Sequence, residues 1–243
     1  MADKSFLIDT TKCTACRGCQ IACKQWNQRP AEKTVNTGSH QNPPDLSVNT
    51  WKVVRFSEPA GESVSWYFFP DQCRHCVSPP CKEVADAKAK GAITIDEATG
   101  AVIFSPKVKV KASDFKEIRE ACPYNIPRIN PATGIMAKCT MCVDRTREGL
   151  LPACVKTCPS GAMSFGDRKA ILEKAQKRLE EVQRLHKEAT LVSPEDVRTI
   201  YLLADDPKKY YKHATASNTL GLSRKLAFSR SIEGESKSPH VSG

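Results

Sequence analysis

Twelve cysteines occur in short runs along this 243-residue chain, and their spacing constrains the fold more than any other feature. The runs are Cys13, Cys16, Cys19 and Cys23; Cys73, Cys76 and Cys81; the single Cys122; and Cys139, Cys142, Cys154 and Cys158. A proline follows the single cysteine and also follows the last cysteine of the final run. The twelve divide into three sets of four with none left over.

The compact first run has the spacing with which bacterial ferredoxins bind [4Fe–4S] clusters. In that pattern the first three cysteines hold one cluster and the fourth reaches a neighbouring cluster. Disulfide bonds would suit a much shorter secreted chain. Structural zinc usually takes two separated Cys-x2-Cys pairs per ion, whereas here a third cysteine follows the second after two residues. The pattern therefore favours iron–sulfur clusters over disulfide bonds and zinc.

The ferredoxin rule assigns all twelve cysteines as iron ligands of three [4Fe–4S] clusters. Each cluster takes one set of four: Cys13, Cys16, Cys19 and Cys158 (set 1); Cys23, Cys139, Cys142 and Cys154 (set 2); and Cys73, Cys76, Cys81 and Cys122 (set 3). Because sets 1 and 2 each draw on the first and the last run, we expect the N-terminal segment and residues 139–158 to pack together.

A fourth cluster would need ligands that the chain lacks. In a complete second run the fourth ligand would fall at Ala85. Counting back from Cys122 by the ferredoxin spacing places the other three at Ile118, Phe115 and Ala112. None of these side chains can bind iron, so we expect side-chain packing to replace the fourth cluster.

The formal charge of +10 overstates how basic the loaded protein is. Each [4Fe–4S]²⁺ cluster with four thiolates carries about −2, so three clusters bring the total to about +4. This reduction removes most of the reason to expect a nucleic-acid partner. The basic residues beside cysteines are either solvated charges or groups that stabilise reduced clusters; they are Lys12, Arg17, Lys24, Arg74, Lys82 and Lys138. His75, between two ligands, is expected to be a surface imidazole, with a hydrogen bond to cluster sulfur as the alternative.

No apolar stretch approaches the ~18–20 residues that a membrane-spanning helix needs. The first residues lack the hydrophobic region of a signal peptide. The chain is therefore expected to be soluble and unable to export itself. It also has neither a P-loop nor a Gly-x-Gly-x-x-Gly fingerprint, so we expect it to have no catalytic site of its own.

The remaining pattern predicts an α+β fold made of two pseudo-symmetric ferredoxin-like cluster modules with long loops and a helical C-terminal extension. Strands are predicted at 6–9 and 161–166, helices at 20–26 and 113–121, and hairpins at 51–56 with 64–69 and at 92–95 with 101–104. Residues 30–50 are rich in turn formers and read as a loop. The predicted modules are 1–50 plus 130–166, with two clusters, and 51–129, with one.

Residues 167–243 are predicted to form a helical extension and tail that contact a partner. Residues 167–188 form an amphipathic helix whose apolar stripe is Leu172, Ala175, Leu179, Val182, Leu185 and Ala189. The stripe packs either on the protein's own body or along a partner subunit. Ser193 followed by Pro194 predicts the start of another helix. From about residue 217 the chain is polar and reads as a tail.

Several motifs give the chain a family resemblance over about residues 5–165. They are Gln72-Cys73-Arg74-His75-Cys76, Pro79-Pro80-Cys81, Cys122-Pro123-Tyr124-Asn125-Ile126-Pro127 and Lys138-Cys139-Thr140-Met141-Cys142. These resemble the iron–sulfur (beta) subunits of the molybdopterin oxidoreductase family. The three-cluster pattern most resembles the beta subunits of soluble tungsten- or molybdenum-containing formate dehydrogenases of sulfate-reducing bacteria.

The resemblance implies a non-catalytic electron-transfer subunit. Its partner would be a catalytic alpha subunit that holds tungsten or molybdenum on a bis-pterin cofactor, has its own iron–sulfur cluster, and oxidises formate to carbon dioxide or the reverse. Cluster 1 would be proximal to that subunit, cluster 2 intermediate and cluster 3 distal. The acceptor would be external, such as a soluble multihaem cytochrome c.

The family also implies a periplasmic location, reached by folded export with a signal-bearing partner, with the cytoplasm as the alternative. Two other functions stay open. One is the iron–sulfur subunit of a polysulfide, thiosulfate or nitrate type of molybdopterin oxidoreductase. The other is a free polyferredoxin, although the long segment after residue 166 favours a subunit.

Overall fold

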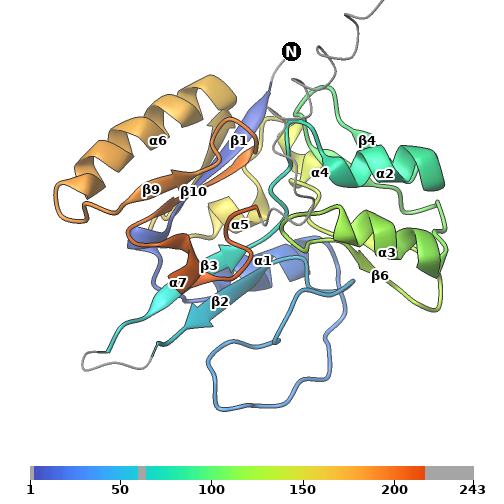
Figure 1. The fold of residues 1–243 in the computed structure, drawn as a ribbon, viewed down its shortest axis with the longest axis horizontal. Coiled ribbons are helices and arrows are strands. Elements are labelled where there is room, and N and C mark those ends of the chain that lie inside the picture. The colour runs from blue at the N-terminus through green and yellow to red at the C-terminus, as the bar shows by residue number, and fades with distance from the viewer. Residues whose placement is uncertain (1–2, 60–63, 217–243) are drawn as a thin grey trace, which may run out of the picture.

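A four-stranded sheet joins the two ends of the described chain (Figure 1). The computed structural model describes residues 3–59 and 64–216. The strand order is β8 (Met163–Asp167), β1 (Lys4–Asp9), β10 (Thr199–Leu203) and β9 (Thr190–Val192). β1 pairs antiparallel with β8 and parallel with β10, and β10 pairs antiparallel with β9. The two central strands therefore come from opposite ends of the sequence.

The two central strands are buried on both faces of the sheet, and alternate residues enter different cores. Phe6, Ile8, Tyr201 and Leu203 pack in one core together with Cys19 and Cys154. Leu7, Ile200 and Leu202 pack in a second core that includes residues of helix α6 (Arg168–Gln183). The period-two alternation of a strand thus separates a face covered by α6 from a face that packs near Cys19 and Cys154, and both cores include cysteines.

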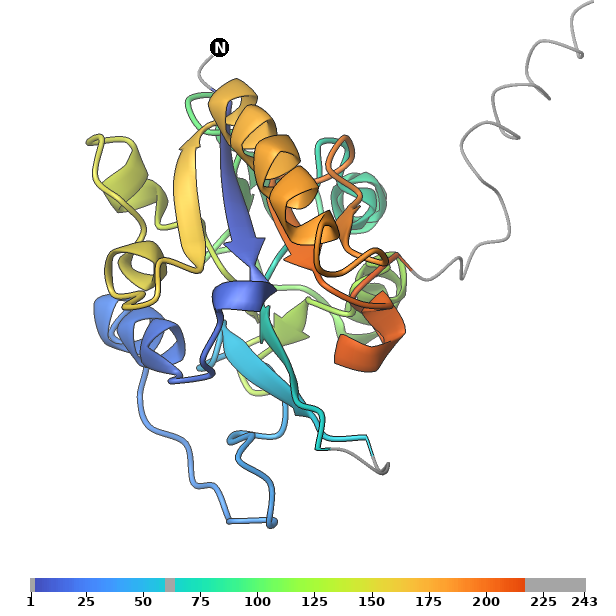
Figure 2. The same cartoon turned by 90° about the vertical axis from the view of Figure 1, so that its left-hand side faces the viewer.

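Helix α6 lies along one face of the sheet (Figure 2). Ala175 and Val182 of the predicted stripe are buried against that sheet, and Leu172 and Leu179 are partly buried there. Of the two alternatives predicted for the stripe, packing against the protein's own body is therefore confirmed. The prediction that Leu185 belongs to the apolar stripe is wrong, because the helix ends at Gln183 and Leu185 is 85% exposed.

The second helix predicted after α6 is wrong. Ser193 has a left-handed backbone (φ 44°) and its carbonyl accepts hydrogen bonds from Asp196 N and Val197 N, which closes a turn rather than capping a helix. The chain then enters β10. The C-terminal extension is therefore not only helical, because it supplies two strands of the sheet, including a central one.

The other predicted elements are confirmed, with ends that differ from the prediction by at most three residues. They are α1 (Gly18–Trp26), the hairpin β2 (Val53–Ser57) and β3 (Tyr67–Asp71), the hairpin β4 (Ile93–Ile95) and β5 (Val102–Phe104), α3 (Ala112–Glu120), β1 and β8. Residues 30–50 form the predicted loop, which projects away from the sheet together with the first hairpin (Figure 1). The predicted tail after residue 217 lies outside the described residues.

Several short elements were not predicted from the sequence. They are the 3-10 helix η1 (Thr10–Lys12), α2 (Pro80–Lys88), β6 (Arg128–Ile129), β7 (Met136–Ala137), α4 (Val143–Thr146), α5 (Ala153–Lys156), β9, β10 and α7 (Pro207–Tyr210). Four of these, namely η1, α2, α4 and α5, border the cysteine runs. No helix within residues 3–59 and 64–216 has the length and apolar character needed to cross a bilayer.

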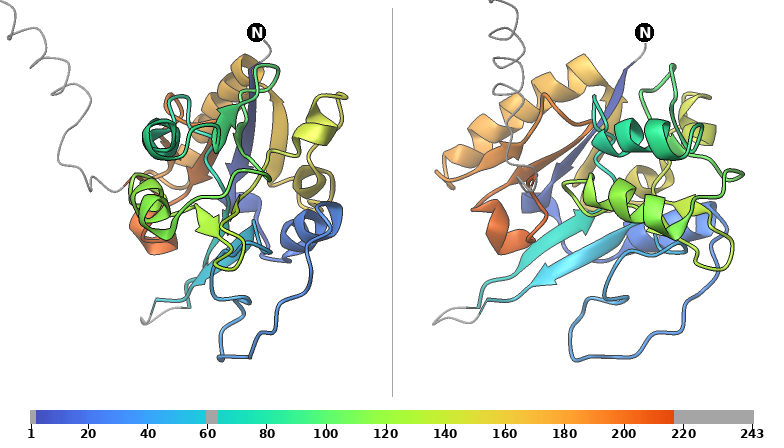
Figure 3. Two further views of the ribbon diagram at one scale, coloured as in Figure 1. Left: turned by 90° about the vertical axis from the view of Figure 1, so that its right-hand side faces the viewer. Right: turned by 45° about the vertical axis from the view of Figure 1, so that its right-hand side comes forward.

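Helices α2 and α3 lie side by side over a third core (Figure 3). Ala85 and Ile118 are fully buried in it, and Phe115 packs against it. Three of the four positions at which a fourth cluster would need ligands are therefore filled by apolar packing. Ala112 instead lies exposed at the start of α3. The position counted back from Cys122 by the ferredoxin spacing therefore does not fall in this core at Ala112. Where the two predicted modules divide stays a prediction.

Gly100 joins β4 to β5 at a place where no side chain fits. Its φ is +74°, and a Cβ would lie 2.2 Å from Arg198 Nε and 2.7 Å from Asp3 Oδ1, which form an ion pair. We expect Gly100→Ala to lower the free energy of unfolding by about 2 kcal/mol, measured by urea unfolding. Gly91→Ala is the matched control, because Gly91 also has a positive φ (+79°) but has open space around it. Equal losses in the two variants would contradict the steric explanation.

Candidate iron–sulfur centres

The structure brings the cysteines together in the three predicted sets. Cys13, Cys16, Cys19 and Cys158 of set 1 line one small cavity, and Cys73, Cys76, Cys81 and Cys122 of set 3 line another. In set 2, burial raises the pKa of the Cys23 thiol well above its usual value, and repulsion from the thiolates of Cys139, Cys154 and Cys142 raises it further, so these four cysteines lie together. The N-terminal run reaches the last run because α1 packs against α5 (Figure 2).

Each of the three sets contains one loop of the same shape. Each loop is a Cys-x-x-Cys segment whose third residue has a left-handed backbone, although none of the three is glycine. These residues are Ala15 (φ 53°), His75 (φ 47°) and Met141 (φ 61°). A left-handed non-glycine backbone costs about 1–3 kcal/mol unless the surroundings hold it in place. The same strain repeated at equivalent positions indicates a shared purpose.

That purpose is to direct backbone N–H groups at sulfur. His75 N donates to Cys73 Sγ at 3.3 Å, and Met141 N donates to Cys139 Sγ at 3.4 Å. Ala15 N makes the equivalent contact with Cys13 and opposes the rise in the pKa of that thiol that burial causes. Hydrogen bonds from N–H groups stabilise a thiolate more than a thiol. The loops are therefore built for charged, ligating sulfur.

The donor chemistry fits iron–sulfur clusters. All twelve cysteines are free. Burial raises the pKa of Cys13 to about 11 and, together with neighbouring thiols, that of Cys76 to about 12. Such thiols hold their protons at neutral pH until a metal displaces them, because only thiolates are ligands. In the described part of the chain, no three Cys, His, Asp or Glu side chains converge as they would around a single metal ion.

The expectation that His75 is a surface imidazole is wrong. The side chain is fully buried, and its Nδ1 accepts a hydrogen bond of 3.1 Å from Val102 N. Burial lowers the pKa of His75 well below its usual value, and the nearby cations Lys138 and Arg198 lower it further. The residue is therefore a neutral part of the set 3 loop. Its position between two ligands was the signal that it would be enclosed.

Buried cations lie beside the three sets, and the sequence identified only some of them. Arg74 and Lys138, which flank ligands, are buried rather than solvated. Lys52 is also buried and was not singled out at all. Arg74 pairs with Asp71 at 3.1 Å, and its guanidinium lies 4.6 Å from the centre of the Tyr201 ring. Its charge is therefore compensated within the protein.

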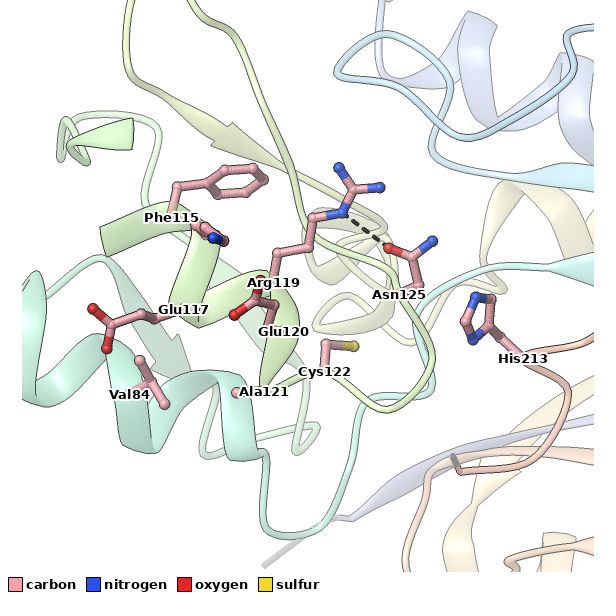
Figure 4. Close-up of a pocket in the computed structure, with 10 residues that line it drawn as sticks. Val84, Phe115, Glu117, Arg119, Glu120, Ala121, Cys122, Asn125 and His213 are labelled. Carbon is pink, nitrogen blue, oxygen red and sulfur yellow. Dashed lines mark hydrogen bonds between the residues drawn. The ribbon is translucent and has the colours of Figure 1, made fainter. Parts of the chain in front are cut away.

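Two places near cysteines open to the surface. Cys16 of set 1 is the one cysteine of the twelve that is classed as exposed, and exposed apolar side chains on α1 include Ile21 and Trp26. At set 3, a cavity of about 810 Å³ lies beside Cys122 (Figure 4). Arg119 and Asn125 are joined by a 2.9 Å hydrogen bond on its wall. The first and third sets thus approach the surface in different places.

Comparisons with known proteins agree with this chemistry. A family model described as a 4Fe-4S dicluster domain matches residues 64–168. The beta subunit of formate dehydrogenase 2 (cytochrome c-553) of Nitratidesulfovibrio vulgaris is 54% identical over 87% of this chain and 98% of its own length. The formate dehydrogenase beta subunit of Megalodesulfovibrio gigas is 51% identical over 88% and 99%. This chain belongs to the family of formate dehydrogenase beta subunits.

A more distant member is the iron–sulfur subunit of the nitrate-inducible formate dehydrogenase of Escherichia coli. It is 38% identical over 86% of this chain and 72% of its own length. Formate dehydrogenase beta subunits are 4Fe-4S electron-transfer proteins, and the 4Fe-4S domain match together with the cysteines of this chain supports iron–sulfur clusters here. The domain match contains eight of the twelve cysteines, namely all four of set 3, three of set 2 and Cys158 of set 1.

Proposed function

We propose that this chain carries three [4Fe–4S] clusters and passes electrons between the catalytic subunit of a formate dehydrogenase and an external acceptor. The observation that carries the proposal is the repeated Cys-x-x-Cys loop with a left-handed third residue, found once in each cysteine set. Each such loop holds sulfur with backbone N–H groups. The same repetition supports the prediction of two related ferredoxin-like modules, one of which lost a cluster.

The ligand assignment rests on which cysteines lie together. Sets 1 and 3 each surround a cavity, and the members of set 2 interact electrostatically. We therefore assign Cys13, Cys16, Cys19 and Cys158 to cluster 1; Cys23, Cys139, Cys142 and Cys154 to cluster 2; and Cys73, Cys76, Cys81 and Cys122 to cluster 3. The apolar core around Ala85 and Ile118 supports three clusters rather than four.

The two exposed places support the order of the relay that the family resemblance implies. Cluster 1 is proximal to the catalytic subunit, since Cys16 is exposed near apolar residues of α1 that a partner would cover. Cluster 3 is distal, since the cavity beside Cys122 gives an acceptor access to it. Cluster 2 lies between them, because its ligands interact with those of both other sets.

The reaction and the partners come from the relatives. The relatives are named as subunits of formate dehydrogenases, so formate is the substrate of their complexes, and one of the names includes cytochrome c-553. These relatives support a catalytic alpha subunit as the partner of this chain, and we infer from the family resemblance that this subunit holds tungsten or molybdenum on a bis-pterin cofactor and has its own cluster. The acceptor is a soluble c-type cytochrome. The complex works in the periplasm, which the chain reaches folded and bound to a signal-bearing partner.

The test is anaerobic purification of this chain through a tag, followed by iron analysis and assay. We expect a large pterin-containing subunit to copurify and about twelve irons to be bound per beta chain, from three clusters of four. Iron in the catalytic subunit is subtracted by analysing that subunit alone. The complex should reduce a c-type cytochrome when formate is added, and cell fractionation should recover it from the periplasm.

Other outcomes would refute defined parts of the proposal. A lone monomer that carries clusters would identify a free polyferredoxin. About sixteen irons in this chain would mean that the fourth site is occupied. A complex that is inert to formate but reduces polysulfide, thiosulfate or nitrate would place the chain in another molybdopterin oxidoreductase.

A further inference from the structure

Lys52 is a buried cation without a carboxylate partner. Its side chain is 2% exposed, and its Nζ donates to Gln72 Oε1 and, at 3.4 Å, to Pro70 O. Pro70 lines the cavity of set 1. Burial alone would lower the pKa of Lys52, but thiolate charge at Cys19 of set 1 and at Cys154 of set 2 raises it above its usual value.

Lys138 is a second cation of this kind. Its side chain is 5% exposed and lines the cavity of set 3. Its Nζ donates to Cys139 O, in set 2, at 2.8 Å and also to Val102 O. The ammonium lies 4.8 Å from the centre of the Phe104 ring, which lines the same cavity. Lys138 thus lies between the second and third sets.

Two other buried cations, Arg55 and Arg74, do have a carboxylate partner. Arg55 and Arg74 both pair with the buried carboxylate of Asp71, at 2.8 and 3.1 Å. No carboxylate within residues 3–59 and 64–216 lies within 4.0 Å of the Nζ of Lys52 or Lys138. Among the described residues, both ammonium groups donate to neutral oxygen acceptors.

A buried ammonium without a counter-charge is strongly unfavourable, so such groups are normally paired or neutral. A [4Fe–4S] cluster with four thiolates supplies negative charge, which increases when the cluster is reduced. A nearby fixed cation therefore favours the reduced state and raises the reduction potential. Lys52 and Lys138 are placed where each serves two neighbouring cysteine sets.

We propose that Lys52 is a counter-ion shared by clusters 1 and 2, and that Lys138 is a counter-ion shared by clusters 2 and 3. This inference rests on the three clusters of the proposed function. Cluster 2 lies beside both lysines, whereas each of the others lies beside one. The two lysines therefore raise the potential of cluster 2 most and hold an electron in the middle of the relay. They act as positioning residues for charge and do not touch substrate.

The test is a redox titration of the whole complex monitored by electron paramagnetic resonance. Lys52→Met and Lys138→Met keep the length of the side chain and remove its charge. In Lys52→Met we expect the reduced-to-oxidised ratio of clusters 1 and 2, at fixed solution potential, to fall about tenfold, which is about 59 mV for a one-electron couple. Cluster 3 should be unchanged. In Lys138→Met, clusters 2 and 3 should shift and cluster 1 should not.

The signals are assigned beforehand with one ligand variant for each set, namely Cys16→Ala, Cys142→Ala and Cys81→Ala. Lys82→Met is the matched control, since Lys82 adjoins the ligand Cys81 but is partly exposed and pairs with Asp86. We expect no shift in that variant. Lys52→Arg keeps the charge and should keep both the iron content and the potentials.

The outcomes separate this inference from the proposed function. Fewer than three cluster signals in the unaltered chain would refute the proposed function itself. Three signals that do not move in Lys52→Met or Lys138→Met, or that move equally in Lys82→Met, would refute only the shared counter-ions. If Lys52→Met fails to bind iron, Lys52→Arg decides: normal iron and potentials support the proposal, and loss of iron in this variant too overturns it.

Discussion

Replacing Cys154 with alanine is expected to stop electrons from crossing this chain. The side chain is buried, belongs to the proposed ligands of cluster 2, and interacts with Cys19 of set 1. Another proposed ligand of cluster 2, Cys139, interacts with Cys73 of set 3. Alanine offers no ligand, so the iron content should fall from about twelve to about eight per beta chain. Formate-dependent cytochrome reduction should fall by roughly 100-fold or more, since even the loss of residues that only support metal ligands costs 10–100-fold.

Thr140→Ser is the control for Cys154→Ala, because Thr140 lies between Cys139 and Cys142, two other proposed ligands of cluster 2, but is not itself a ligand. It should keep both iron and cytochrome reduction. Small dyes that take electrons at the catalytic subunit should still be reduced in Cys154→Ala, which separates a broken relay from a failed partner. Unchanged cytochrome reduction with eight irons would remove cluster 2 from the path.

Asp71→Asn is expected to destabilise the fold more than any other single polar substitution proposed here. Its carboxylate is fully buried, and it accepts hydrogen bonds from Arg55 Nη2 at 2.8 Å and from Arg74 Nη1 at 3.1 Å. The amide keeps the shape but leaves two buried guanidinium groups without their shared charge. Breaking a buried pair costs about 3–5 kcal/mol, and we expect a loss of that size in anaerobic urea unfolding.

The control is Asp86→Asn, which removes the carboxylate partner of Lys82 on the surface of α2. An exposed pair contributes about 0–1 kcal/mol, so this variant should unfold almost as the unaltered protein does. Replacing Arg74 as well as Asp71, with methionine and leucine, should recover part of the loss, because the variant no longer leaves that guanidinium uncompensated. Equal losses in Asp71→Asn and Asp86→Asn would contradict the buried network.

The cysteine sets were predictable because cluster ligation is governed by local spacing. Three cysteines separated by two or four residues can reach one cluster only within a tight loop, and the fourth must then come from elsewhere. This reasoning named the sets that the structure brings together. It could not show the left-handed backbone at Ala15, His75 and Met141, because residues of three different types adopt it and none is glycine.

The central place of β10 was not predictable from its own residues. The run Thr199–Leu203 is apolar on both faces, a pattern that fits either a buried strand or a helix segment. Its parallel partner β1 lies at the other end of the chain, beyond the reach of local patterns. The same limit explains two wrong predictions. The helical stripe was extended to Leu185, beyond the end of α6, and Ser193 was predicted to start another helix, although the chain turns there towards the sheet.

Lys52 was missed because a lysine is normally solvated. Its neighbours Thr50, Val53 and Val54 are all buried, so the segment is enclosed on both faces and the lysine cannot reach water. A lysine between buried β-branched residues, as here between Thr50 and Val53, is a sequence signal of a buried cation. By contrast, Arg74 and Lys138 were already marked by their position beside ligands, although the sequence left open whether they were solvated.

The pairing of β1 with β10 also constrains how the protein is made. The ribosome releases β1 first, but its parallel partner ends at Leu203 and emerges only when most of the chain has been synthesised. Contacts between such distant segments form slowly. The nascent chain therefore exposes its thiols before the framework around them can close. Iron delivery must wait for the finished polypeptide, or a chaperone must shield the cysteines until then.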